Sequence, residues 1–224
     1  MEINKNTVII SLVSLLLIFS FLFAVYKFTN APQTSPVVES AKTEQANDHS
    51  KWSSEKKNIL VKYSDLQCPA CQAFDAMIRS QIEASPPANT GQAEVTKKIT
   101  FIYRHFPLAQ HQFSRDAAYA AEAAGKQGKF YEMVSLLFDT QNTWSKEKSV
   151  NEFFEGLAKQ LDLNLEQFKK DRDSSEVKQK VNADYQSGIA AGVNATPTFF
   201  LNGQKVTSRS FDEFKQLLVE TASK

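Results

Sequence analysis

The chain has 224 residues, of which 42% are hydrophobic, so it is long enough to bury the core of one globular domain. Its 26 basic and 25 acidic residues leave a net charge of +1, which excludes a strongly charged surface built to attract nucleic acid. The chain has only 2 cysteines, both in one short stretch, which excludes the disulfide framework of small secreted domains.

Residues 8–26 form the first strong pattern, because they are almost all apolar and include no charged side chain. A helix of this length, rising about 1.5 Å per residue, just crosses the hydrocarbon core of a bilayer. We therefore predict a single transmembrane anchor over 8–26, preceded by a short cytoplasmic amino terminus over 1–7. The alternative is a cleaved signal peptide, since Thr29, Asn30 and Ala31 offer a cleavage site of small residues.

The segment after this span has the composition of a tether. From Ala31 to about Ser50 it consists mainly of Pro, Gln, Thr, Ser, Glu, Lys, Ala and Asn, without apolar periodicity. We predict a flexible linker over 27–51 and one folded domain over 52–224.

A strand, a turn and a helix are predicted around the two cysteines. The run from Ile59 to Tyr63 is rich in β-forming residues and predicts the strand. Pro69 suits the first turn of a helix, where its missing N–H costs nothing, so Cys68 falls at the helix start. Apolar residues then recur at helical spacing, namely Phe74, Met77, Ile78 and Ile82.

A second strand and a helical region follow. Ile99 to Phe106 predicts the strand, after a loop rich in Pro, Asn, Thr and Gly. The region 112–192 predicts an insertion of helices, because its apolar residues follow helical spacing. The expected helices cover 116–124, 130–138, 150–161, 165–172 and 177–191.

The carboxyl-terminal part predicts a hairpin and one more helix. Asn202 and Gly203 stand between two short apolar runs, 198–201 and 205–207, which is a hairpin signal. The last helix begins after Ser210, whose partner Glu213 completes a capping box.

The two cysteines are the residues best suited to chemistry. A cysteine at a helix amino terminus faces free backbone N–H groups and the positive end of the helix dipole, which both favour the thiolate. Cys68 is therefore the predicted nucleophile. Cys71, one helical turn later on the same face, is placed to attack a mixed disulfide on Cys68 and resolve it. The pattern predicts thiol–disulfide exchange.

Four stretches between Trp52 and Ser223 occur in an order typical of one known family. They are Ser64-Asp65-Leu66-Gln67-Cys68-Pro69-Ala70-Cys71, Tyr103-Arg104-His105-Phe106-Pro107-Leu108 with His111, Gly128-Lys129-Phe130-Tyr131-Glu132-Met133, and Ala195-Thr196-Pro197-Thr198-Phe199. Together they resemble the DsbA-like thioredoxin-fold thiol–disulfide oxidoreductases. The resemblance implies an α/β thioredoxin fold with an inserted helical subdomain, here preceded by the transmembrane helix.

The resemblance also implies a substrate site and partners. Pro197 would follow a cis peptide bond beside Cys68, leaving the backbone at Thr196 free to pair with an extended substrate chain. The implied activity introduces disulfides into reduced exported proteins, with re-oxidation by a quinone-linked membrane partner. It uses no cofactor and no metal. A redox-active disulfide belongs in an oxidising compartment, so we expect the domain to lie outside the cytoplasm.

Three residues near the cysteines are candidates for tuning the site. Family members often carry a glutamate six positions before the first cysteine, where this chain has Lys62. Lys62 either points toward the cysteines and stabilises the thiolate, or faces solvent from a sheet edge. Asp65 either handles protons or forms an Asx turn. Pro69-Ala70 lacks the histidine of the most oxidising relatives, so we expect a milder oxidant.

Other functions use the same residues. Cys68, Cys71, His105 and His111 are a tolerable inventory of zinc ligands, although the gap between the two pairs is long. A disulfide reductase or isomerase would use the same two sulfurs as an oxidase. A non-catalytic peptide-binding module on this scaffold is a further alternative, against which the retention of both cysteines argues.

Overall fold

The computed structural model describes residues 14–23, 25–26, 37–84 and 91–224. The chain divides into two units, Met1–Ser35 and Pro36–Lys224. Within the described part of the chain, no helix is both long enough and apolar enough to cross a membrane. The span predicted over 8–26 lies partly outside the described residues, at 8–13 and 24, so the anchor stays a prediction.

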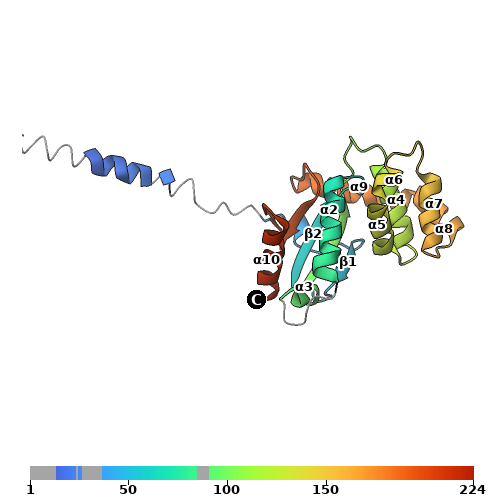
Figure 1. The fold of residues 1–224 in the computed structure, drawn as a ribbon, viewed down its shortest axis with the longest axis horizontal. Helices are drawn as coiled ribbons and strands as arrows, with labels where there is room; N and C mark the ends of the chain where they lie inside the picture. Colours follow the sequence, from blue (N-terminus) through green and yellow to red (C-terminus); the bar gives the residue numbers. More distant parts are fainter. Residues whose placement is uncertain (1–13, 24, 27–36, 85–90) are drawn as a thin grey trace, which may run out of the picture. The chain divides into compact units, whose positions relative to one another are not determined.

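The second unit is built on a five-stranded sheet with the order β1-β3-β2-β4-β5 (Figure 1). The strands are β1 (His49–Trp52), β2 (Asn58–Ser64), β3 (Ile99–His105), β4 (Thr198–Leu201) and β5 (Gln204–Lys205). β2 and β3 are parallel, while β1 and β4 pair with them in antiparallel orientation. The two parallel strands are buried almost throughout, as expected of strands that are covered on both faces.

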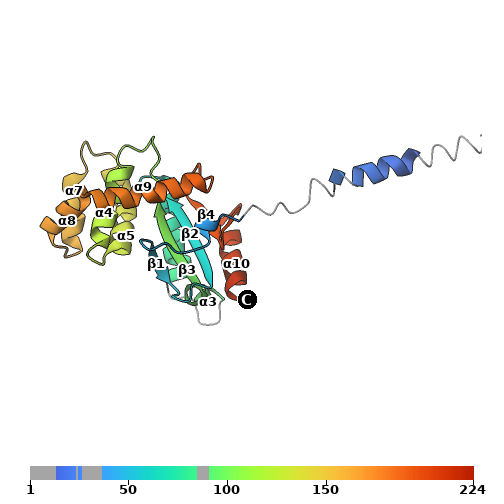
Figure 2. The same cartoon turned by 180° about the vertical axis from the view of Figure 1, so that it is seen from behind.

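Helices cover both faces of this sheet. They are η1 (Glu39–Ala41), α2 (Pro69–Ile78), the π-helical turn η2 (Arg79–Glu83), α3 (Gln92–Lys98), α4 (Ser114–Gly125), α5 (Phe130–Asp139), α6 (Gln141–Trp144), α7 (Asn151–Gln160), α8 (Leu165–Asp173), α9 (Ser175–Ala190) and α10 (Phe211–Ala222). One apolar cluster joins Leu60 and Phe101 to α2, α3, α10 and the inserted helices. Another joins Val61 and Ile102 to residues of η1 and α9. The two views show α2 and α9 on opposite faces of the sheet (Figures 1 and 2).

The elements predicted around the cysteines and the hairpin are confirmed. β2, α2 and β3 lie where the patterns place them, and α4, α5, α7, α8 and α9 match the expected inserted helices to within a few residues. Asn202 and Gly203 have φ angles of 51° and 80°, as a two-residue hairpin turn of this type requires. The Ser210 hydroxyl accepts a hydrogen bond from the Glu213 N–H at 3.2 Å, whereas the Glu213 carboxylate accepts from the N–H of Arg209.

The linker predicted over 27–51 is wrong for residues 37–51, which are folded, so the domain does not begin at 52. The cause is Arg104, whose buried guanidinium donates to both carboxylate oxygens of Asp48 at 3.0 and 2.7 Å. It also donates to the carbonyl oxygen of Ser40. This segment is ordered by an ion pair and by strand pairing, so apolar periodicity does not reveal it.

The segment just before β3 also differs from its sequence prediction, which is a loop. Residues Gln92–Lys98 form the short helix α3, whose Val95 is buried in the same cluster as residues of α10. Glu94 in its first turn and two lysines in its last turn complement the helix dipole. A helix this short depends on its tertiary packing, which local sequence does not encode.

Replacing Asp48 with Ala is expected to destabilise the protein, because the buried guanidinium of Arg104 then loses its carboxylate. The free energy of unfolding should fall by about 3–5 kcal/mol. Denaturant titration measures this change, with Glu94→Ala as control, since the Glu94 side chain is 45% exposed and pairs with Lys97. The control should change stability by less than about 0.5 kcal/mol. Equal effects of the two substitutions would contradict the role given to Arg104.

Candidate active site

Cys68 immediately precedes α2 and has the extended backbone of an N-cap residue, with φ −78° and ψ 122°. Pro69 occupies the first turn of the helix, as predicted. The backbone N–H groups of Ala70 and Cys71 act on the Cys68 sulfur and favour its thiolate. The sequence prediction that Cys68 lies at a helix start is therefore confirmed.

Asp65 fixes the turn that leads into Cys68. One oxygen of its buried carboxylate accepts a hydrogen bond from the Gln67 N–H at 2.7 Å, which forms an Asx turn. The other oxygen accepts from the Leu108 N–H at 2.8 Å and lies 2.7 Å from Nδ1 of His111. Because both oxygens are occupied, this geometry favours the turn-forming role of Asp65 over proton handling.

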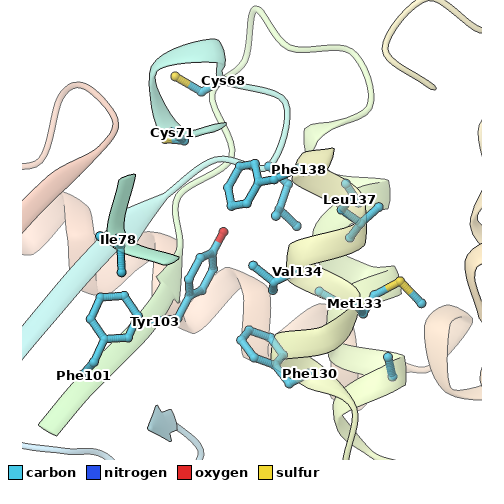
Figure 3. Packing of buried hydrophobic residues seen from close by; sticks show 14 of the residues in the cluster. Cys68, Cys71, Ile78, Phe101, Tyr103, Phe130, Met133, Val134, Leu137 and Phe138 are labelled. Carbon is cyan, nitrogen blue, oxygen red and sulfur yellow. The ribbon is translucent and has the colours of Figure 1, made fainter. Parts of the chain in front are cut away.

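The two sulfurs differ in exposure and in partners. Both are free thiols; Cys68 is 7% exposed and Cys71 is fully buried. The Cys68 Sγ lies 3.4 Å from the carbonyl oxygen of Thr196, and the Thr196–Pro197 peptide bond is cis. The Cys71 Sγ accepts from the Asp65 N–H at 3.5 Å. Cys71 lies on the side of α2 that faces the core residues Phe138 and Tyr103 (Figure 3).

The pKa values of the two cysteines move in opposite directions. The nearby Cys71 thiol has the largest lowering effect on the pKa of Cys68, and the backbone N–H groups of Cys71 and Ala70 lower it further, so that this pKa falls to about 5 although burial opposes the shift. Burial raises the pKa of Cys71, and its hydrogen bond to Cys68 raises it further. At neutral pH the reduced pair is a Cys68 thiolate beside a Cys71 thiol, which suits thiol–disulfide exchange.

Lys62 points into the protein, so the alternative of a lysine facing solvent from a sheet edge is wrong. It lies on the central strand β2 and is only 1% exposed. Its Nζ is 4.0 Å from Oδ1 of Asp75 and lies over the rings of Tyr103 and Phe138, at 5.6 and 5.1 Å from their centroids. Its charge acts on both cysteines, and burial lowers the pKa of Lys62 itself.

Two residues of the site were not predicted from the sequence, namely Gln141 and Asp75. Gln141, in α6, donates hydrogen bonds to the carbonyl oxygens of Leu66 and Cys68 at 2.7 and 3.1 Å. No local pattern signals such a contact from the inserted helices. Asp75 was detectable, since it follows Cys71 by four positions and so shares its helical face.

The four zinc ligands considered from the sequence do not come together. His105 contacts Glu122 through Nε2 at 3.0 Å, and His111 contacts Asp65. Among the described residues, the one group of three or more potential metal-ligating side chains is His105, Glu122 and Asp184, which includes neither cysteine. Both carboxylates of that group already have protein partners, since Glu122 also contacts His49 and Asp184 accepts from Lys180.

Comparison with known proteins gives one family match over most of the chain. The family model described as "Thioredoxin" matches residues 46–220. Among curated proteins, the chain is 32% identical over 195 residues to a Na(+)/H(+) antiporter NhaA 1 of Mycolicibacterium vanbaalenii, covering 84% of this chain and 29% of that protein. It is 30% identical over 159 residues to a Na(+)/H(+) antiporter NhaA of Herminiimonas arsenicoxydans, and this match covers 71% of this chain and 23% of that protein. The chain thus spans less than a third of these relatives.

Several solved structures have a similar fold, with TM-scores above 0.6. A thioredoxin-like oxidoreductase from Silicibacter pomeroyi has a TM-score of 0.64 and 22% identity, covering 83% of this chain and 97% of that one. A variant of α-DsbA1 from Wolbachia pipientis, with two cysteines replaced by alanine, has a TM-score of 0.63 and 19% identity, and the match covers 84% of this chain and 98% of that one. Oxidised BdbD from Bacillus subtilis has a TM-score of 0.62 and 19% identity, and the match covers 85% of this chain and 97% of that one. At these identities the likeness is one of fold.

The pKa of Cys68 predicts how the reduced protein responds to pH. Alkylation by iodoacetamide should follow the thiolate and reach half its maximal rate near pH 5, and Cys68→Ser should remove this reaction while Cys71 stays unreactive. The pKa of Cys68 in the folded protein lies below its ordinary value of 9.0, so the Cys68 thiolate stabilises the folded, reduced protein. This contribution to stability is complete above pH 9 and disappears as the pH falls to about 5. A midpoint near 9 for alkylation of Cys68 would contradict the assignment.

Proposed function

The chain belongs to the thioredoxin family and is a thiol–disulfide oxidoreductase, and from this premise we propose that it introduces disulfides into exported proteins from a membrane anchor. The observation that carries the proposal is the position of the Cys68 sulfur. It lies at the start of α2 in a residue that is 7% exposed, and it is 3.4 Å from the Thr196 carbonyl oxygen.

The mechanism follows from this geometry. A reduced substrate lies in extended form along the backbone beside Thr196 and Pro197, and its thiolate attacks Cys68 of the Cys68–Cys71 disulfide. The Cys68–Cys71 bond breaks, and Cys71 leaves with the electron pair. A second substrate thiolate then attacks the substrate sulfur of the mixed disulfide, which forms the substrate disulfide and releases Cys68 as a thiolate.

The direction of exchange depends on the stability of the reduced form. Because the Cys68 thiolate is stabilised, reduction of the enzyme is favoured, and its disulfide is the better oxidant for that reason. This supports an oxidase over a reductase or isomerase. A protein disulfide held by a quinone-linked membrane partner would restore the Cys68–Cys71 bond.

The amino-terminal segment supports membrane attachment. The described helix over 14–23 exposes a run of large apolar side chains: Leu15, Leu16, Leu17, Ile18, Phe19, Phe21, Leu22 and Phe23. Such a surface is unfavourable in water and favourable in lipid. The proposal assigns the anchor to 8–26, residues 1–7 to the cytoplasm and the catalytic domain to the outside, which is also the compartment where disulfides persist.

Substitution of the two cysteines tests the function. Cys68→Ser should abolish oxidation of a reduced test protein, because the Cys68–Cys71 disulfide that the substrate attacks can no longer form. Cys71→Ser should trap mixed disulfides between Cys68 and substrate, visible as adducts lost on reduction. An active Cys68→Ser variant would refute the mechanism. A reduction potential below that of the thiols in its compartment would instead indicate a reductase.

Membrane attachment is tested by fractionation of cells expressing the full chain. The protein should remain in the membrane pellet after an alkaline wash, whereas a variant lacking residues 1–35 should be soluble and keep its exchange activity, since the domain forms a separate unit. A mature protein whose mass corresponds to cleavage after Ala31 would indicate a signal peptide in place of the anchor.

A further inference from the structure

The side chain of Gln141 reaches from the inserted helices to the backbone of the cysteine motif. Gln141 is buried, and its Nε2 donates to the carbonyl oxygen of Leu66 at 2.7 Å and to that of Cys68 at 3.1 Å. We propose that Gln141 is a positioning residue that sets the oxidising strength of the cysteine pair by fixing the backbone of Cys68. The inference rests on the proposed function and deepens it, since it names what tunes the exchange.

Both polar groups of the Cys68 backbone are engaged in hydrogen bonds. Its N–H donates to the carbonyl oxygen of Asp65 at 3.2 Å. Its carbonyl oxygen accepts from the Gln72 N–H at 3.1 Å, the first helical hydrogen bond of α2, and also from the Gln141 amide. Hydrogen bonds on both sides of one residue restrict its φ and ψ angles, so they fix the direction in which the side chain leaves the backbone.

The peptide group between Leu66 and Gln67 is also held at both ends. Its carbonyl oxygen accepts from Gln141, and its N–H donates to the Asp65 carboxylate at 2.7 Å. Leu66 is buried, and among the described residues only Gln141 donates to its carbonyl oxygen. A buried carbonyl group without a donor is unfavourable, so loss of the amide would make this turn move until the oxygen finds another donor.

The stability of the Cys68 thiolate depends on how the turn is oriented. The Cys71 thiol lowers the pKa of Cys68 most, and the N–H groups of Cys71 and Ala70 lower it further. Such interactions weaken steeply when the N–H no longer points at its acceptor. A displaced Cys68 backbone therefore destabilises the thiolate of the reduced form, whereas the Cys68–Cys71 disulfide carries no charge and is affected less. Gln141 thus favours the reduced form, which makes the disulfide a better oxidant.

The packing of the insertion places Gln141 at the motif. Gln141 is the first residue of α6, and at the other end of this helix Trp144 is fully buried. The Trp144 Nε1 donates to the carbonyl oxygen of Leu137 at 2.7 Å, and its ring lies 5.4 Å from that of Phe154 between centroids. Leu137 and Phe138 mark the end of α5 that lies toward the cysteines (Figure 3). Because a helix of four residues has little stability of its own, these contacts hold the Gln141 amide in place.

Two other glutamines join the motif to the insertion, but in a different way. The Gln72 side chain donates to the carbonyl oxygen of Phe138 at 2.6 Å, and that of Gln67 accepts from the Phe113 N–H at 2.7 Å. These bonds attach the motif to the insertion. In the part of the chain that the structure describes, Gln141 is the glutamine whose side chain contacts the Cys68 backbone.

The test is the redox equilibrium of the full-length protein with glutathione at neutral pH. Gln141→Met removes the amide and keeps the length of the side chain. The ratio of reduced to oxidised enzyme at a given glutathione potential should fall about tenfold, which corresponds to a reduction potential about 30 mV lower. The midpoint for alkylation of Cys68 should rise from about 5 by about one pH unit, since a tenfold loss of thiolate stability equals one pKa unit.

Gln127→Met is the matched control. The Gln127 side chain also bonds to a backbone through both ends of its amide, to the carbonyl oxygen and the N–H of Asn164 at 3.2 and 2.9 Å, but it joins the end of α4 to the start of α8. This variant should keep the wild-type ratio and midpoint. Equal shifts in the two variants would overturn the inference.

The redox ratio separates positioning from a structural role. A structural role alone would destabilise the oxidised and reduced forms equally, so Gln141→Met would unfold more easily with an unchanged ratio, and this result would overturn the inference. Should Gln141→Met fail to fold, Gln141→Asn decides, because its shorter amide cannot span both carbonyl groups; a smaller shift in the same direction is expected, and an unchanged ratio would again overturn the inference. Either failure leaves the proposed function intact as long as Cys68→Ser is inactive.

Discussion

Cys68 and Cys71 lie within one helical turn but in different surroundings, and the rest of the site depends on this contrast. Cys68 caps α2, where backbone N–H groups without helical partners stabilise negative charge. Cys71 is enclosed by the core, where burial opposes any charge. The reactive thiolate therefore forms on the sulfur that a partner reaches, and the buried sulfur stays a thiol until it is needed.

The inserted helices hold this turn in place as well as covering the sheet. The segment between β3 and α4 supplies the Leu108 N–H and His111, which both contact Asp65, while α6 supplies Gln141, which binds the carbonyl oxygens of Leu66 and Cys68. The nucleophile is thus fixed by contacts from residues far away in the sequence. A fixed nucleophile loses less entropy on attack, so the insertion contributes to the chemistry.

Patterns that act over a few residues were sufficient to predict the cysteine site and most of the scaffold. The β-rich run before Cys68, Pro69 at the helix start and Asn202-Gly203 each encode their structure locally. β1 and the segment before it were not predicted to be folded, because their folded conformation depends on contacts with Arg104 and on pairing with β3. The burial of the Lys62 side chain was also not predictable, since it depends on β2 being a central strand between β3 and β4.

The burial of Lys62 is difficult to explain by stability alone. Removing an ammonium from water is costly, Asp75 is too distant for a hydrogen bond, and the rings of Tyr103 and Phe138 offset only part of this cost. An apolar side chain would fill the same space without the penalty.

The sign of the charge has a further consequence for the redox couple. A glutamate at this position would disfavour a thiolate nearby, whereas the charges of Lys62 and of the Cys68 thiolate attract each other, since Cys68 raises the pKa of Lys62. Favouring the reduced form makes the disulfide a stronger oxidant, while Ala70, in place of the histidine of the most oxidising relatives, has the opposite effect. The two departures from the family pattern therefore act against each other on the reduction potential.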